Sequence, residues 1–113
     1  MRHVATALTA LLLAGSAQAA SFDCTRARSA DEHAICNIRA LNDRDVKMAT
    51  LYALDIRLVP MGSRDAIKRD QALWLDSRRA CRADTTCLAR VYDRRIAVLQ
   101  AVIDTRVYPR GPF

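Results

Sequence analysis

Three long stretches of the chain repeat apolar side chains at the spacing of an α-helix, about 3.6 residues, and this pattern restricts the fold more than any other feature. They run from about residue 38 to 58, from about 63 to 81 and from about 84 to 106. A shorter helix is expected after Ser29, because Ser29 and Glu32 have the spacing of an N-terminal capping box. Strand signals are weak throughout. The predicted class is therefore all-α, a small domain of about four helices, one short and three longer.

Turn and capping residues mark the expected ends of the long helices. Pro60 is expected to end the first of them. Ser63 is expected to cap the second, with Asp65 in its first turn, where a negative charge suits the helix dipole. Asp84 or Thr85 is expected to cap the third. Short connections of this kind predict helices that pack against one another as a bundle.

Residues 1–19 have the pattern of a cleavable signal peptide. Arg2 supplies a charged start, residues 4–13 are apolar, and an Ala-x-Ala pattern ends at Ala19. The apolar run is too short to remain as a membrane-spanning helix. We expect cleavage after Ala19, a soluble product that begins at Ala20, and a periplasmic or secreted location without a transmembrane segment.

The expected product is one small basic domain. Residues 20–106 hold the helical domain, and residues 107–113, which include two prolines and a glycine, are expected to form an extended and flexible C-terminal tail. The whole chain has 18 Lys and Arg against 12 Asp and Glu, for a net charge of +6. Most of this excess remains after the loss of Arg2, and it favours anionic partners at long range.

Four cysteines follow the predicted signal peptide, and an even number in an exported chain indicates two disulfides. Sequence alone allows three pairings. We predict the local pairing, Cys24 with Cys36 and Cys81 with Cys87. The reason is that Cys81 closes one predicted helix and Cys87 opens the next, while Cys36 ends the short first helix.

Each long helix carries polar side chains where its pattern calls for apolar ones. Asp45 lies within the apolar stripe of the first, Gln71 and Arg78 share the face of Trp74 on the second, and Arg95 lies in the stripe of the third. A buried charge without a partner is costly, and arginine can bind a carboxylate through two parallel hydrogen bonds. These positions therefore predict contacts between the helices.

We predict that Asp45 meets Arg78, Arg95 or both, and that Gln71 or the hydroxyl of Tyr52 completes the hydrogen bonding. Two interpretations follow. Such a network can fix the register of the helices and do no chemistry, as charged networks often do. It can also form a partly open polar pocket beside Trp74 that accepts a ligand group.

Several of these positions also carry a family resemblance. The matching pieces are SFDC at 21–24, AIC at 34–36, Asp45 seven residues before Tyr52, the pattern Q-x2-W-L-x2-R-x2-C at 71–81 and the pattern C-L-x3-Y-x2-R-I-x2-L at 87–99. The chain resembles the lysozyme inhibitor LprI-like N-terminal family of small bacterial envelope proteins over residues 21–99. Arg44 departs from the leucine that the family often has there. The resemblance implies a disulfide-linked helical domain and, for a few members, inhibition of lysozyme.

Catalytic, metal and cofactor sites are not expected. The predicted product has one histidine, His33, without a nucleophile partner, and one glutamate, Glu32, which the capping box uses. The cysteine spacings do not match zinc sites, and a C-x-x-C redox motif is absent. The arginines are scattered and aromatic residues are few, which disfavours nucleic-acid binding.

Two functions fit these observations. The first is a non-enzymatic binding protein of the envelope that inhibits lysozyme-like, peptidoglycan-cleaving enzymes, and it depends on the resemblance. The second is a basic envelope module that binds an anionic cell-wall polymer, lipid or protein without inhibiting an enzyme, and it depends on the net charge.

Overall fold

The computed structural model describes residues 20–110, and within this part of the chain four α-helices form and no strand does. They are α1 (Ala30–Asn37), α2 (Arg39–Leu58), α3 (Met61–Ala80) and α4 (Thr85–Val102). A 3₁₀ turn, Cys24–Arg26, precedes them. The predicted all-α class, with one short and three long helices, is confirmed. The predicted signal peptide, residues 1–19, lies outside the described residues.

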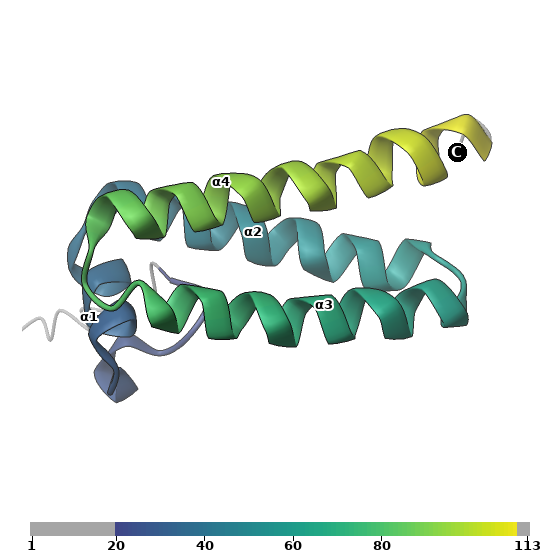
Figure 1. Ribbon diagram of the computed structural model, residues 1–113. Helices are drawn as coiled ribbons and strands as arrows, with labels where there is room; N and C mark the ends of the chain where they lie inside the picture. The colour runs from purple at the N-terminus through teal and green to yellow at the C-terminus, as the bar shows by residue number, and fades with distance from the viewer. Residues whose placement is uncertain (1–19, 111–113) are drawn as a thin grey trace, which may run out of the picture.

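The three long helices lie side by side, and α1 packs at one end of them (Figure 1). The chain reverses at each short connection, so α3 runs antiparallel to both α2 and α4. The turn between α3 and α4 lies at the same end of the bundle as α1, whereas the turn between α2 and α3 lies at the opposite end. Residues from α1 and from the N-terminal segment can therefore reach only one end of the bundle core.

Two of the three helix starts agree with the capping pattern. The capping box of α1 is present, with the Glu32 carboxylate accepting from the backbone amides of Arg28 at 2.7 Å and Ser29 at 3.4 Å. Asp84 caps α4, because its Oδ1 accepts from the amide of Cys87 at 3.0 Å. Local side-chain hydrogen bonding was therefore sufficient to predict where α1 and α4 begin.

Helix α3 begins earlier than expected. Ser63 was the predicted cap, but the helix starts at Met61 after Pro60, so that prediction is wrong. The Pro60 carbonyl accepts from the amide of Arg64 at 2.9 Å and so makes the first bond of the helix.

The end of the described chain also differs from expectation. Residues Ile103–Val107 continue α4 as a π-helical turn, and Tyr108–Arg110 form a 3₁₀ turn. The extended backbone predicted from residue 107 is therefore wrong for 107–110. Pro109 fits a short 3₁₀ turn, because such a turn requires few amide donors.

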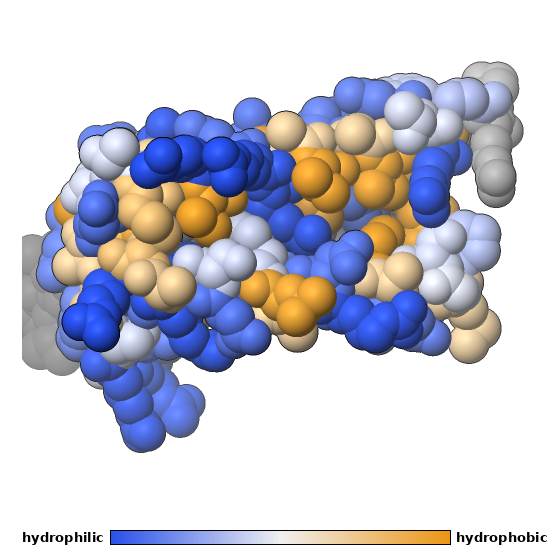
Figure 2. All heavy atoms as spheres, viewed as in Figure 1, coloured by the Kyte–Doolittle hydropathy of each residue, from blue (hydrophilic) through white to orange (hydrophobic). Residues whose placement is uncertain are grey.

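The bundle core is formed by the predicted stripes. Trp74 and Tyr92 pack edge to face, with ring centroids 5.2 Å apart, and the indole Nε1 of Trp74 donates to the carbonyl of Val91 at 3.1 Å. In Figure 2, hydrophobic residues gather along the line where α3 and α4 face each other, between hydrophilic outer surfaces. The large apolar side chains of the core are Ile35, Leu41, Met48, Leu51, Val59, Ile67, Trp74, Leu88, Tyr92 and Leu99.

Both predicted disulfides are present. Cys24 pairs with Cys36 and Cys81 pairs with Cys87. The first ties the N-terminal segment to the end of α1, and the second closes the turn between α3 and α4. Arg82, in this turn, has a φ of 53°, and this left-handed conformation helps the chain to reverse within a few residues.

Removal of the first disulfide gives a direct test of its role. A Cys24→Ala, Cys36→Ala double variant is expected to lose about 2–3 kcal/mol of unfolding free energy, because the short closed loop restricts the unfolded chain. Urea denaturation of both proteins at equal concentration measures this loss. Equal midpoints would show that the disulfide does not stabilise the fold.

A buried polar network that ends in a basic pocket

Asp45 lies at the centre of a buried hydrogen-bond network. Its side chain comes from α2, and the residue has no exposed surface. The hydroxyl of Tyr92 on α4 donates to Oδ1 at 2.8 Å, and the backbone amide of Ser21 donates to Oδ2 at 2.6 Å. Nη1 of Arg78 on α3 lies 4.0 Å from Oδ1. One carboxylate thus joins α2, α3, α4 and the N-terminal segment.

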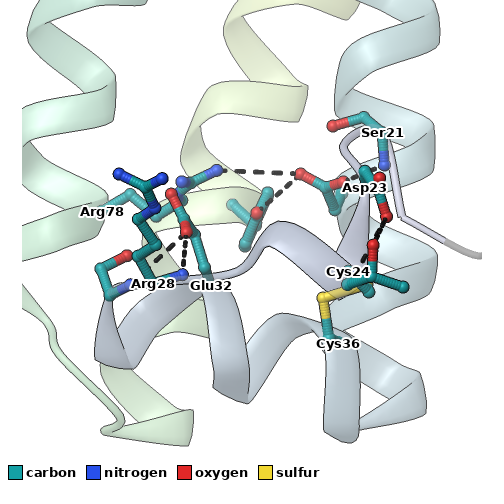
Figure 3. Close-up of a disulfide and its surroundings, with 11 residues drawn as sticks. Ser21, Asp23, Cys24, Arg28, Glu32, Cys36 and Arg78 are labelled. Atoms are coloured by element: carbon teal, nitrogen blue, oxygen red, sulfur yellow. Dashed lines mark hydrogen bonds and ion pairs between the residues drawn. A yellow bond between two sulfur atoms is a disulfide. The ribbon is translucent and has the colours of Figure 1, made fainter.

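Arg78 is held by a second carboxylate from α1. Its Nε donates to Oδ2 of Asp31 at 2.8 Å, and both side chains are almost fully buried. The guanidinium carbon lies 5.7 Å from the ring centre of Phe22 and 5.8 Å from that of Trp74, within range of cation–π attraction. Arg78 therefore lies between Asp31 and Asp45, and the aromatic rings limit its access to water. Figure 3 shows Arg78 with Ser21, Glu32 and the Cys24–Cys36 disulfide at this end of the bundle.

The network stabilises one protonation state of its members. Burial raises the pKa of Asp31, but hydrogen bonds and the positive charge of Arg78 outweigh this effect, and the net pKa lies below the usual range. Burial and the neighbouring Asp45 carboxylate raise the pKa of Tyr92 far above its ordinary value. Tyr92 therefore remains a hydrogen-bond donor, and Asp31 remains an ionic partner for Arg78, across the physiological pH range.

A second polar group lies around Arg95 on α4. Nε of Arg95 donates to Oε1 of Gln71 at 2.9 Å, and Nη2 donates to the carbonyl of Ile67 at 3.4 Å. Nε2 of Gln71 contacts the sulfur of Met48 at 3.2 Å. Burial lowers the pKa of Arg95, while nearby acidic groups and Tyr52 oppose that shift. Gln71 therefore links all three long helices through α3.

Asp55 lies fully buried on α2, and neither carboxylate oxygen has a hydrogen-bond partner. Burial raises its pKa to about 6, although the positive charge of Arg95 acts in the opposite direction. A buried carboxyl group without hydrogen bonds favours its neutral form, because ionisation would place an unsolvated charge in the core.

The sequence predicted one network, and the structure contains two. The expected contact between Asp45 and Arg78 is present at 4.0 Å, but no ion pair joins Asp45 to Arg95. The hydroxyl that donates a hydrogen bond to the Asp45 carboxylate belongs to Tyr92, so the predicted contribution of Tyr52 is wrong. Gln71 binds Arg95 and not Asp45.

Sequence reasoning missed two of the buried acids, for different reasons. Asp55 lies three residues after Tyr52 and four after Leu51, so the apolar spacing of α2 could have identified it. Asp31 lies in the first turn of a helix of eight residues, which is too short to define a face by periodicity. Its burial depends on Arg78, which is 47 residues away in the chain.

The network ends at the protein surface in an open pocket of about 440 Å³. Three arginines, Arg26, Arg78 and Arg79, line it together with two acidic residues, so the lining residues are more basic than acidic. Trp74 was expected beside such a pocket but does not line it, because Arg78 lies over the indole. The lining residues are Ser21, Phe22, Asp23, Arg26, Glu32, Leu75, Arg78 and Arg79.

Between residues 20 and 110, no group of three or more His, Cys, Asp or Glu side chains is arranged to hold a metal ion. In the same range, no helix has the length and apolar character needed to cross a membrane.

The class that fold and site define is a small, disulfide-linked helical domain with a buried polar network and a basic surface pocket. Comparison of the chain with protein-family models, curated proteins and solved structures gives no match.

Proposed function

We propose that the protein is an exported, non-enzymatic binding protein of the bacterial envelope, and that it inhibits lysozyme-like peptidoglycan hydrolases through its basic pocket. The observation that carries this proposal is the group of three arginines, Arg26, Arg78 and Arg79, around one surface pocket. The family resemblance of residues 21–99 supports the same function.

The chemistry of the pocket suits a partner with carboxylates in a cleft. An exposed arginine can make charge-assisted hydrogen bonds with such carboxylates and so block them. Among the described residues, the side chain of Arg79 makes one ion pair, an exposed contact of 3.3 Å with Asp76, one turn away on the same helix. Exposed pairs of this kind contribute little to stability, so Arg79 can turn toward a partner at low cost. Arg78 is already bound by Asp31 and would mainly support the pocket wall.

Burial of charged residues makes the surface more basic than the composition suggests. Within residues 20–109, three acidic residues, Asp31, Asp45 and Asp55, are buried, against two basic residues, Arg78 and Arg95. Animal lysozymes are also strongly basic, so long-range charge opposes their approach to this protein. Inhibition would therefore depend on short-range bonds inside the cleft.

The same surface supports a second candidate function, binding to an anionic cell-wall polymer, lipid or acidic protein without inhibition. This function needs only the excess of exposed basic side chains, and it predicts affinity that falls steeply with salt. The two candidates differ in whether enzyme activity is lost and in whether particular arginines are required.

A lysis assay tests the first candidate. The protein is expected to inhibit a lysozyme at a nearly equimolar dose. The Arg26→Ala, Arg79→Ala double variant is expected to inhibit at least about tenfold less well, which corresponds to about 1.4 kcal/mol of binding. Arg90→Ala, an exposed change on α4, is the matched control and should inhibit as well as the original protein.

Other results would favour the alternative or neither function. Absence of inhibition, together with salt-sensitive capture on purified cell wall or anionic vesicles, would support the anionic-polymer or lipid function. Inhibition that survives in the double variant would show that the pocket is not the contact surface.

A further inference from the structure

The outer face of α2 has an apolar strip that no other part of the described chain covers. The α2 outer face, as we use the term, consists of Asp43, Val46, Thr50, Ala53, Leu54 and Arg57. Val46 and Leu54 are 44% and 42% exposed, although both are large apolar residues. Five of the six residues line a shallow groove, and Asp43 lies one turn before Val46. In the view of Figure 1, α2 lies behind α3 and α4. All six residues of this face are exposed.

The face has the spacing of a helix-to-helix contact. Asp43, Val46, Thr50, Ala53 and Arg57 follow one another at alternating intervals of three and four residues. This spacing produces a narrow seam along a helix, as in coiled coils. The core stripe of α2, which includes Met48, is on the opposite side of the helix. Helix α2 therefore has one seam that packs in the bundle core and a second seam that is exposed in the described structure.

The charges at the ends of this seam are complementary to each other. Asp43 lies at one end and Arg57 at the other, both are exposed, and neither takes part in an ion pair within residues 20–110. If two copies of α2 pair in opposite directions around Thr50, Asp43 of each copy lies opposite Arg57 of the other. Val46 then lies opposite Leu54 in both halves of the contact. Parallel pairing would instead place like charges together, which is unfavourable.

We propose that the α2 outer face is a self-association surface, through which two copies of this chain form a symmetric antiparallel dimer. Symmetric dimers are the commonest oligomers, and they require a surface that is complementary to itself. The alternation of Asp43, Val46, Leu54 and Arg57 about Thr50 meets that requirement. None of the six residues of this face lines the basic pocket, although Ser21 lines both that pocket and the groove.

The dimer is expected to be weak. One helix face is small compared with the roughly 1,600 Å² of a standard interface, and only two large apolar residues contribute from each copy. The net positive charge of each copy also opposes association. A dissociation constant of about 10–100 μM is the expected range. Salt dependence would not be decisive, because salt screens both the favourable pairs and the net repulsion.

Charge exchange provides the decisive test. Sedimentation equilibrium of the exported protein, with its disulfides intact, should show dimers between about 5 and 500 μM. Asp43→Arg should weaken association at least about tenfold, because it places arginines opposite arginines. The Asp43→Arg, Arg57→Asp double variant should restore the dissociation constant to within about threefold of the original. Asp76→Arg, on the exposed side of α3, adds the same charge elsewhere and is the control.

Cross-linking at the proposed symmetry axis provides a second measurement. Thr50→Cys should form a disulfide between two copies under mild oxidation, because the two Thr50 positions face each other. Ala97→Cys, exposed on α4, should form it much more slowly. A monomer throughout the concentration range, a dimer indifferent to Asp43→Arg, or failure of the double exchange to restore it would overturn the proposal. Circular dichroism should first show that each variant is folded.

Discussion

Replacement of Asp45 by alanine is expected to lower the free energy of unfolding by about 3–5 kcal/mol. The change removes the acceptor of the Tyr92 hydroxyl and of the Ser21 amide, and both donors are in or beside the core. It also removes one of the two carboxylates near Arg78. Buried donors that lose their acceptors bear the full cost of desolvation. The total free energy of unfolding of a protein domain is only about 5–15 kcal/mol, so this loss should clearly lower the midpoint of urea denaturation.

Two matched variants separate the causes of this loss. Asp45→Asn keeps the size of the side chain and one carbonyl acceptor, so it should cost less than Asp45→Ala. Asp76→Ala removes an exposed acid, whose ion pair with Arg79 is also exposed, and should cost less than about 1 kcal/mol.

Other outcomes would change the interpretation of the site. Equal and small losses for Asp45→Ala and Asp76→Ala would show that Asp45 is solvated and that the network interpretation is wrong. A loss of partner binding without a loss of stability would make the network part of a binding site. As it stands, the burial of Asp31, Asp45 and Arg78 favours a role as scaffold behind the basic pocket.

Replacement of Asp55 by asparagine is expected to stabilise the protein at neutral pH, by up to about 3 kcal/mol. The pKa of Asp55 is raised from 3.8 to about 6, so the folded protein binds this proton more tightly than the unfolded chain does. The stabilising effect of that proton is complete below the ordinary pKa and is lost as the pH rises through about 6. Asparagine has a similar shape and carries no charge at any pH.

The effect should therefore depend on pH in a defined direction. The Asp55→Asn variant should exceed the original protein in stability at pH 7.5, and the difference should shrink toward zero as the pH falls from 6 to below 4. Urea denaturation of both proteins at three or four pH values measures this difference. Asp76→Asn is the control, since its carboxylate is exposed and its replacement should alter stability little at any pH.

A constant difference between the two proteins, or a larger difference at low pH, would contradict this account. A constant difference would mean that folding leaves the pKa of Asp55 unchanged, and a larger difference at low pH would mean that Asp55 is ionised and well paired in the folded protein. Arg95 is a candidate for that pairing, because its charge already acts on Asp55.

Much of the fold follows from local features of the sequence. The apolar stripes predicted three long helices, and capping residues such as Ser29 and Asp84 predicted where two helices begin. The disulfide pairing also followed from local order, since each cysteine pairs with the nearest one along the chain. These features depend on neighbours within one or two helical turns, and sequence displays such neighbours directly.

The sequence also determined that the polar residues within the apolar stripes of the long helices enter the core. Asp45, Arg78 and Arg95 are buried because they occupy apolar positions of their own helices, and a helix cannot turn one residue of its stripe toward solvent without turning the others. Asp55 obeys the same rule. The burial of these four residues is therefore a local property of α2, α3 and α4.

Only the tertiary structure decided which of these residues meet. The hydroxyl that donates to Asp45 belongs to Tyr92 and not to Tyr52. Arg95 donates to Gln71. Arg78 donates to Asp31, which lies on a helix too short for its apolar spacing to predict a buried face. These partners lie between 24 and 47 residues apart in the chain. Their contacts depend on how far each helix slides and rotates against the next, and periodicity within one helix leaves both quantities open.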